Sequence, residues 1–420
     1  MAVGKRSRGA AEVTSGPIDD IFAALAGRPD VVSFAVGAPD PALLPSELVA
    51  ALAQTVVGRY GSAVLQYGMT QGFAPLLDQA RNLLHNRAIR CTPDRLHIST
   101  GGSGALHNVC LALLDPQDVV LVETPTYGPA VKEFRSHGAT VVAVPSDEFG
   151  IVPEALAEAL ARFDAAFVYL LPTFQNPIGR TMPADRRERI AEIVIRHGTL
   201  VVEDDVYADL RYRGAAQPAL SSFAPDNSIY ITSLSKTLAP AIRVGITVMP
   251  PDLLRTVLAL KQGIDMQTST YCQAIAAEFL ASAAGVAHLA HVVDAYSAKL
   301  DALSVALERH FPAGFRWIEP EGGMFLWVEG PPDFDADALL ARALRQGVAF
   351  LPGSAFYADD VAEHRNTMRL SFANVPREDI DRGIAALAAV CGGHGMSGQP
   401  RRRQRSVTTQ GPAHAERDTA

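Results

Sequence analysis

From about Leu96 onwards, short apolar and β-branched runs alternate with turns and helical patterns. Each run is short enough to be one buried strand, and the helical patterns between them are long enough to cross back over a sheet. Strands connected in this way lie parallel in one sheet. The alternation therefore predicts an α/β fold on a mostly parallel sheet, with strands near 97–100, 119–122, 140–144, 166–171, 200–202, 229–232 and 242–249.

The segments on either side of this alternation follow other patterns. A short amphipathic helix is predicted over Pro17–Leu25, and a long Ala-rich helical stretch over 273–310 leads into mixed strands and helices. The two ends of the chain lack periodicity. We therefore expect a loose arm over 1–16, an N-terminal segment over 17–48 that packs with a small domain, a large domain over 49–295, that small α+β domain over 296–391 and a disordered tail over 392–420.

Composition narrows the class of protein. The chain of 420 residues is 48% hydrophobic and 20% charged, which suits a large buried core, and its net charge of −8 favours neither nucleic acid nor an anionic membrane as a partner. The four cysteines are far apart, without CxxC or Cys/His metal spacing, as in a reducing compartment. No uninterrupted apolar stretch has the length of a membrane span, and we do not expect a secretory signal, because no apolar run follows the basic residues near the N-terminus. We expect a cytoplasmic protein without a metal site.

Lys236 follows the end of a predicted strand, with Ser233 and Ser235 just before it and Arg243 seven residues after it. An amine in this position can form a Schiff base with an aldehyde cofactor, while the hydroxyls and the guanidinium hold a phosphate. A surface turn with a solvated lysine is the alternative interpretation of these residues alone.

Other polar groups also follow predicted strands, where the carboxyl ends of a parallel sheet gather ligands. Gly102 and Ser103 open a helix whose free N–H groups suit a phosphate, although neither a P-loop nor GxGxxG is present. Asp204 follows apolar strand residues, where a buried carboxylate implies a cationic partner such as a pyridinium nitrogen.

Four further side chains suit a flat, anionic ligand. Tyr127 can stack on a ring, Asn176 can bind a phenolic oxygen, and Tyr207 can reach the same ring. Arg369 lies in an alternating strand, where a guanidinium can hold a carboxylate with two hydrogen bonds. Taken singly, a loop tyrosine and a surface ion pair are the ordinary interpretations of Tyr127 and Arg369.

Taken in order, these residues resemble the fold-type I aminotransferases that use pyridoxal phosphate (PLP), in particular the 2-aminoadipate and kynurenine aminotransferase subgroup. The likeness covers about residues 18–390. It rests on the ordered segments VVSFAVGAPDP, LQYG, ISTGGSGAL, ETPTYGPA, FQNPIG, VVEDDVY, SLSKTLAPAIRVG, KQG, EGGMFLWV and MRLSFA. The resemblance implies a large domain with a mostly parallel seven-stranded sheet flanked by helices, and a smaller α+β domain.

The resemblance also implies roles for individual residues. Lys236 would form the internal aldimine and carry the proton between Cα and C4′, and Asp204 would keep the pyridine nitrogen protonated. Arg369 would bind the substrate α-carboxylate, with Gly37 nearby. The remaining cofactor contacts would come from Asn176 and Tyr207 to O3′, Tyr127 on the ring, and Gly102, Ser103, Ser233, Ser235 and Arg243 on the phosphate, with Tyr67 contributed by the other subunit of a homodimer.

The implied reaction moves the amino group of an L-α-amino acid to a 2-oxo acid by a ping-pong scheme. Aminoadipate-type relatives place an arginine in the first helix, where this chain has Asp19 and Asp20. One hypothesis is that Asp19 meets a cationic donor such as a guanidino or basic amino acid. The alternative is that Asp19 and Asp20 are there only because acidic residues favour the first turn of a helix. The donor would then be of the aromatic or 2-aminoadipate type.

Three other classes share this scaffold. A PLP-dependent β-lyase or decarboxylase would break a different bond at Cα. A transcriptional regulator with an aminotransferase-like domain carries a long DNA-binding domain, whereas about 16 residues precede the first predicted helix here. A catalytically inactive cofactor-binding protein is disfavoured by the presence of both Lys236 and Asp204.

Overall fold

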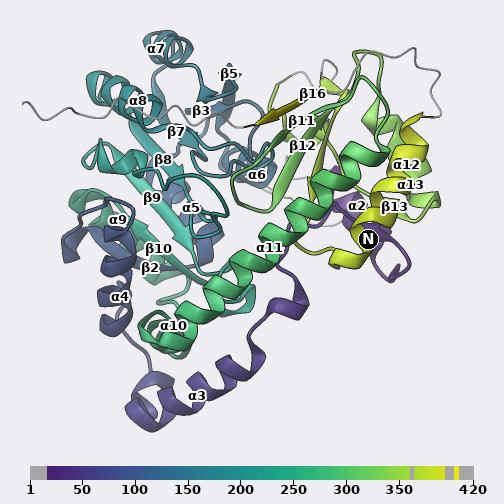
Figure 1. The fold of residues 1–420 in the computed structure, drawn as a ribbon. Helices are drawn as coiled ribbons and strands as arrows, with labels where there is room; N and C mark the ends of the chain where they lie inside the picture. The colour runs from purple at the N-terminus through teal and green to yellow at the C-terminus, as the bar shows by residue number, and fades with distance from the viewer. Residues whose placement is uncertain (1–16, 360–363, 393–401, 406–420) are drawn as a thin grey trace, which may run out of the picture.

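The computed structural model describes residues 17–359, 364–392 and 402–405, and the predicted N-terminal arm lies outside these ranges. Two β-sheets form the frame of the molecule (Figure 1). A long helix, α11 (Ala283–His310), runs from the side of the larger sheet to the smaller one.

The large sheet has seven strands in the order β2-β10-β9-β8-β7-β3-β4. All neighbouring pairs are parallel except the two that involve β10, which lies antiparallel to both β2 and β9. The mostly parallel seven-stranded sheet expected from the sequence is therefore confirmed. Its strands are β2 (Leu96–Thr100), β3 (Val119–Glu123), β4 (Thr140–Val144), β7 (Ala165–Leu170), β8 (Leu200–Asp204), β9 (Ser228–Ser233) and β10 (Val244–Val248).

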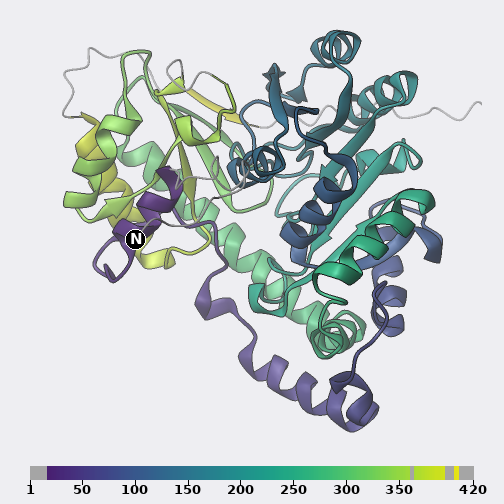
Figure 2. The same ribbon diagram turned by 180° about the vertical axis from the view of Figure 1, so that it is seen from behind.

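Helices cover both faces of this sheet (Figures 1 and 2). Successive residues of β3 show the reason, because Val120 and Val122 pack in the same core cluster as α5 and α6, whereas Leu121 packs with α7 and α8. Further helices enclose the β2 edge. The helices of this part are α3 (Ser46–Tyr60), α4 (Ala74–His85), α5 (Gly101–Leu113), α6 (Gly128–Ser136), α7 (Pro153–Arg162), α8 (Ala184–His197), α9 (Pro251–Ile264) and α10 (Thr270–Ala281).

The small sheet has the order β14-β15-β12-β11-β16 and packs against α11, α12 (Ala336–Arg345) and α13 (Ile380–Gly392). Its strands are β11 (Arg316–Glu319), β12 (Phe325–Glu329), β14 (Leu351–Pro352), β15 (Thr367–Ser371) and β16 (Arg402–Arg405). β16 lies in the tail for which no regular structure was predicted, so that prediction does not hold for these four residues. It pairs in parallel with β11, whose edge would otherwise leave backbone groups unpaired.

The N-terminal segment lies along the small sheet before the chain reaches α3 (Figure 2). It contains α2 (Pro17–Leu25) and β1 (Val32–Ser33), and β1 pairs in parallel with β13 (Val348–Ala349). A second two-stranded sheet joins β5 (Ser146–Asp147) to β6 (Gly150–Ile151). Phe34 is fully buried, and its carbonyl accepts the N–H of Ser371 at 2.8 Å. This segment therefore passes directly beside the strand that carries Arg369.

Two element boundaries differ from the sequence prediction. The strand expected from Ile242 begins at Val244, because Pro240–Ile242 form a 3-10 turn and Arg243 adopts left-handed backbone angles (φ +52°). The long helical stretch divides at Ser282, which has extended backbone angles and caps α11 by accepting the N–H of Gly285. The predicted domain boundary at 295/296 falls inside α11.

α3 and the 3-10 turn that follows it span Ser46–Leu65, a segment with the length and hydropathy of a membrane span. Glu47 and Arg59 interrupt it, which is why the sequence shows no uninterrupted apolar run. Much of its apolar surface is exposed, including Val57 and Leu65. The segment therefore presents an exposed apolar surface.

Candidate active site

A cavity of about 360 Å³ lies where the carboxyl ends of several strands of the large sheet face the small sheet and the N-terminal segment. β8 ends at Asp204, β9 leads into Lys236, and α5 starts directly after β2. Of the fourteen site residues predicted from the sequence, the cavity brings together twelve, namely Gly37, Gly102, Ser103, Tyr127, Asn176, Asp204, Tyr207, Ser233, Ser235, Lys236, Arg243 and Arg369.

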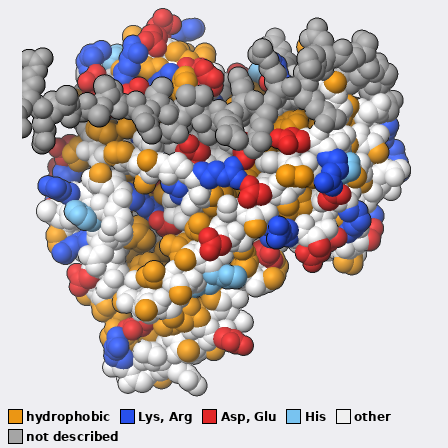
Figure 3. Space-filling model, in the orientation of Figure 1, with side chains coloured by type: hydrophobic (Ala, Val, Ile, Leu, Met, Phe, Trp, Pro, Cys, Tyr) orange, Lys and Arg blue, Asp and Glu red, His pale blue; other side chains and the backbone are white. Residues whose placement is uncertain are grey.

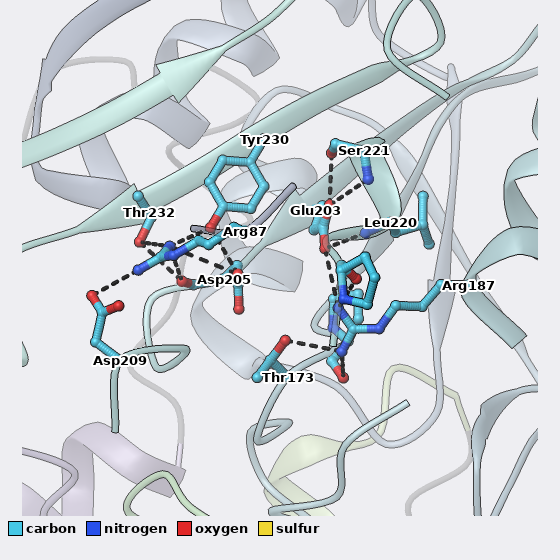
Figure 4. Close-up of polar contacts among 12 residues, drawn as sticks. Arg87, Thr173, Arg187, Glu203, Asp205, Asp209, Leu220, Ser221, Tyr230 and Thr232 are labelled. Atoms are coloured by element: carbon cyan, nitrogen blue, oxygen red, sulfur yellow. Dashed lines mark hydrogen bonds and ion pairs between the residues drawn. The ribbon is translucent and has the colours of Figure 1, made fainter. Parts of the chain in front are cut away.

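Three consecutive acidic residues, Glu203, Asp204 and Asp205, stand at the end of β8 and its following turn. Because side chains alternate along a strand, Glu203 and Asp205 point away from the cavity, whereas Asp204 lines it. The carboxylates of Glu203 and Asp205 are buried on the side away from the cavity and belong to the polar contacts drawn in Figure 4. Their partners explain how three acidic side chains are accommodated together.

Glu203 is fully buried and is held by donors from the turn before β9 and from α8. Its carboxylate accepts the N–H of Leu220 at 2.9 Å and the N–H and hydroxyl of Ser221 at 2.7 and 2.6 Å (Figure 4). The guanidinium of Arg187 lies 3.8 Å away and also donates to Thr173 at 3.0 Å. These contacts satisfy the buried charge and fix the strand end.

Asp205 is held by a second buried group (Figure 4). It accepts the hydroxyl of Tyr230 at 2.7 Å, and Arg87 lies 3.7 Å from the same oxygen. Arg87 also donates to Asp209 at 2.7 Å and to Thr232 at 2.9 Å. The backbone on both sides of Asp204 is thus anchored, which sets the direction of the Asp204 side chain.

Asp204 lines the cavity, and one of its oxygens is unpartnered among the described residues. Its Oδ2 accepts the hydroxyl of Tyr169 at 2.7 Å, while its buried Oδ1 has no hydrogen-bond partner among the described residues. Burial raises the pKa of Asp204 to about 6, against the hydrogen bond from Tyr169 and the charge of Lys236, which lower it. A cationic ring nitrogen at Oδ1 would supply the missing partner.

Lys236 lies in the turn after β9, with its Nζ 3.3 Å from the carbonyl oxygen of Gly37. Burial, together with the charges of Arg369 and Arg243 and against the attraction of Asp204, lowers the pKa of Lys236 to about 8. A lysine with this pKa is about one-tenth neutral at pH 7, far more than a lysine with the ordinary pKa. Its amine is therefore able to act as a nucleophile.

An anion-binding group surrounds the next part of the cavity. The hydroxyl of Ser233 donates to Ser235 at 2.9 Å, and Arg243 Nη1 lies 3.4 Å from the Ser235 hydroxyl. Gly102 and Ser103 add the first turn of α5, whose free N–H groups attract anions. Three kinds of donor therefore converge where a phosphate would be bound.

Arg369 lies on β15, only 4% exposed, and faces the cavity from the small sheet. It donates to Asn176 Oδ1 at 3.0 Å and to the Ala35 carbonyl at 2.7 Å. Its guanidinium carbon lies 4.2 Å from the ring centre of Phe325 and 4.9 Å from that of Phe356. Burial lowers the pKa of Arg369 to about 10, which still leaves it charged at neutral pH.

The two cavity tyrosines are uncharged phenols in this environment. Burial raises the pKa of Tyr127 to about 12 and also raises the pKa of Tyr207. The ring of Tyr207 packs edge-on against Phe325, with centroids 5.6 Å apart. Both hydroxyls are therefore available as hydrogen-bond donors.

Two predicted site residues do not line the cavity. Tyr67 is 74% exposed. Asp19 is half-exposed and accepts a hydrogen bond from Lys132 at 3.1 Å. α2 instead presents Ile18 and Phe22 to the cavity.

Sequence reasoning missed several residues of this site. Ile18, Phe22, Phe325 and Phe356 line the cavity, but each reads as an ordinary core residue in its own segment. Tyr169, on the neighbouring strand β7, donates a hydrogen bond to Asp204. Pairing the two residues requires the register of β7 with β8, which the sequence pattern does not give.

Comparison with known proteins agrees with this geometry. The family model described as aminotransferase class I and II matches residues 29–387. A 2-aminoadipate transaminase of Thermus thermophilus is 37% identical over 90% of this chain and 94% of its own length. An aromatic-amino-acid aminotransferase of Thermococcus litoralis is 34% identical over 86% of this chain and 87% of its own length.

A solved structure extends the likeness to three dimensions. The α-aminoadipate aminotransferase of Thermus thermophilus, complexed with N-(5′-phosphopyridoxyl)-L-leucine, superposes with a TM-score of 0.84 at 35% identity, over 92% of this chain and 97% of that one. The ordered motifs, the fold and the cavity all lead to one assignment. The chain belongs to the class I and II aminotransferases.

Proposed function

We propose that this enzyme uses PLP to move the amino group of an L-α-amino acid to a 2-oxo acid, in two half-reactions through one site. The observation that carries the proposal is the convergence of the Lys236 amine, the unpartnered Asp204 oxygen and the Arg369 guanidinium in one cavity. A second substrate site is not needed, because the donor leaves as a 2-oxo acid before the acceptor binds.

The residues of the cavity fit PLP. Asp204 Oδ1 lacks a partner and suits a protonated pyridine nitrogen, and Ser235 and Arg243 suit a phosphate. When bound, PLP supplies an aldehyde carbon for the amino group and a ring that withdraws electrons from Cα. Lys236 would hold the cofactor through its amine, and the same amine, once the substrate amine has replaced it, would carry the proton at Cα.

The substrate is held at its carboxylate. Arg369 is anchored by Asn176, by Ala35 and between two aromatic rings, so its position does not depend on the substrate. Two parallel hydrogen bonds from a fixed guanidinium orient an α-carboxylate, which in turn directs the Cα–H bond.

The donor side chain is proposed to be apolar or aromatic. Among the described residues, the charged groups of the cavity are Asp204, Lys236, Arg243 and Arg369, and each already has a role. Ile18, Phe22 and Leu351 offer an apolar surface, whereas the Asp19 carboxylate is paired with Lys132 outside the cavity. We therefore do not retain the cationic donor. The aromatic-amino-acid aminotransferase relative and the leucine adduct support an uncharged side chain, whereas the 2-aminoadipate transaminase relative is named for an acidic donor.

Absorbance titration tests both proposals. The purified enzyme is expected to absorb in the visible range, to lose this band with phenylalanine or leucine and to regain it with a 2-oxo acid. Lys236→Ala provides the control, since it keeps the cavity but removes the amine. Ammonia or CO₂ release without an acceptor would indicate a lyase or decarboxylase. A preference for arginine or 2-aminoadipate over phenylalanine would contradict the apolar donor.

We further propose a homodimer in which Tyr67 reaches the site of the partner. Tyr67 lies in an exposed apolar loop with Leu65 and Met69, which are 70% and 75% exposed. Gly68 in this loop donates to Gln267, which places the exposed Met266 beside it. Hydrophobic side chains are frequent over the lower part of this face, around α3 and α10, with a few charged side chains among them (Figure 3). Covering by a second copy explains this surface without a membrane.

A cytoplasmic location belongs to the same proposal. All four cysteines are free thiols. Free, partly buried cysteines suit a reducing compartment.

A further inference from the structure

A second group of chemically active side chains lies outside the cavity, on α5 and at the end of α6. His107 lies on α5, Glu133 lies on α6, and His137 caps the end of α6. One nitrogen of each ring and one oxygen of the carboxylate all lie within 4.8 Å of one another. None of the roles assigned above uses these three residues.

The carboxylate lies between the two rings. Glu133 Oε1 is 2.7 Å from His107 Nδ1 and 3.2 Å from His137 Nε2, and the ring centroids are 5.4 Å apart. A tetrahedral Zn²⁺, with bonds of about 2.0–2.1 Å, separates its ligand atoms by about 3.3 Å. Small side-chain rotations would therefore place one ion in contact with all three atoms.

We propose that His107, Glu133 and His137 bind a divalent transition-metal ion of the Zn²⁺ type. Two imidazoles and one carboxylate are ligands that Zn²⁺ accepts, whereas Ca²⁺ and Mg²⁺ require more oxygen ligands than this group offers. The side chains are 42%, 29% and 14% exposed, so the ion has access from solvent and water can complete its coordination.

The ion would link the two helices that flank the cofactor cavity. α5 starts at Gly101, and its first turn lines the anion-binding part of the cavity. α6 starts at Gly128, directly after Tyr127, and both Tyr127 and Pro129 line the cavity. A bond through the metal therefore fixes the spacing of α5 and α6, a structural role separate from the amino-transfer chemistry.

Sequence spacing did not reveal this group. His107 and Glu133 are 26 positions apart, and only Glu133 and His137 show the i,i+4 spacing of one helix face. Metal motifs are recognised by short spacings between Cys and His. The packing of α5 against α6 brings the third ligand into place.

Isothermal titration calorimetry with ZnCl₂ tests the proposal. The sample is the full-length, tag-free PLP enzyme without any amino acid. Wild type is expected to bind one ion per chain, and His107→Ala, Glu133→Gln and His137→Ala are each expected to weaken binding by at least about tenfold. The matched control is His310→Ala, because His310 contacts the carboxylate of Asp381 at 3.1 Å on another part of the surface.

Thermal unfolding provides the second measurement. Zinc is expected to raise the Tm of wild type and of His310→Ala, but not that of the three ligand variants, because only binding to the folded state stabilises it. Retention of the visible PLP band shows that each variant is folded. Wild type that binds no stoichiometric zinc, or zinc binding that survives in all three ligand variants, would overturn the proposal and leave an ordinary hydrogen-bonded cluster.

Discussion

Among the individual residues, Asp204 shows how its surroundings set its chemistry. Glu203 and Asp205 on either side of it are buried with their own donors, so neither competes for a cofactor. Within the part of the chain that the structure describes, Asp204 accepts one hydrogen bond, from Tyr169, and its Oδ1 has no partner. Its pKa therefore depends mainly on burial, which raises it, and on the Tyr169 hydrogen bond, which lowers it, with smaller effects of Asp205 and Lys236.

Tyr169→Phe tests this balance. Removing the hydroxyl takes away the interaction that lowers the pKa of Asp204, so this pKa rises further. Since hydrogen bonds to charged groups contribute about 1.5–3 kcal/mol, we expect the acid limb of the kcat/KM profile to move up by about one pH unit. Activity should return towards the wild-type value at higher pH.

Tyr230→Phe is the matched control. Tyr230 donates to Asp205 in the same way, but on the side that faces away from the cavity. Its removal should lower stability and leave the acid limb in place. Equal shifts in both variants would contradict a specific link between Tyr169 and Asp204.

Among the elements, the start of α5 combines two constraints. Gly101 has φ +73°, and a Cβ there would lie 2.4 Å from Arg243 Nη2. Arg243 itself has left-handed backbone angles, which direct its guanidinium towards Thr100 and Ser235. The absence of a side chain at Gly101 is therefore what lets Arg243 approach the helix start.

Gly101→Ala is expected to weaken PLP binding by about tenfold or more, because the methyl group displaces the Arg243 guanidinium from the phosphate position. Gly198→Ala is the control, since Gly198 has a similar φ of +67° but open space around its Cβ position. Both variants should lose about 1–2 kcal/mol of stability from the left-handed backbone. A PLP dissociation constant that rises equally in both would contradict the role of Arg243.

For the protein as a whole, one buried residue of the large sheet links stability to pH. His97 lies on β2, fully buried, and neither ring nitrogen has a partner among the described residues. Burial lowers the pKa of His97 to about 4. Between about pH 6.5 and pH 4 the unfolded chain therefore binds more protons at His97 than the folded chain does. The free energy of unfolding is highest above this window and decreases as the pH falls through it.

Urea unfolding of wild type and of His97→Gln at pH 7.5 and pH 5 measures this effect. Other groups titrate in the same range, so the test is the difference between the two proteins. Wild type is expected to lose about 2 kcal/mol more than the variant on acidification, at about 1.4 kcal/mol per unit of pKa difference. Equal losses in both proteins would show that His97 does not contribute.

The proposed assembly predicts complementation between two inactive chains. Lys236→Ala lacks the amine but keeps Tyr67, whereas Tyr67→Ala lacks the phenol but keeps Lys236. If Tyr67 acts across the interface, unfolding and refolding an equal mixture should restore about a quarter of wild-type activity, because half of the random dimers contain one complete site. Recovery no greater than that of either variant alone would contradict the shared site.

The sequence alone determined the sheet and most of the cavity. Strand and helix periods are local properties, so the alternation from Leu96 predicted the parallel strands and hence which residues follow their ends. The order of the polar motifs then identified the family before any contact was known.

We propose that the boundary between the two domains lies within α11 rather than in a loop, because the helix runs between the two sheets.

Only the tertiary structure decided which residues meet across the chain. Tyr169 reads as a core strand residue until the register of β7 and β8 places it 2.7 Å from Asp204. The rotation of α2 turns Ile18 and Phe22 towards the cavity and leaves Asp19 with Lys132. The group formed by His107, Glu133 and His137 likewise depends on packing between two helices. A one-dimensional pattern encodes period and order, whereas distances between remote side chains arise only from packing.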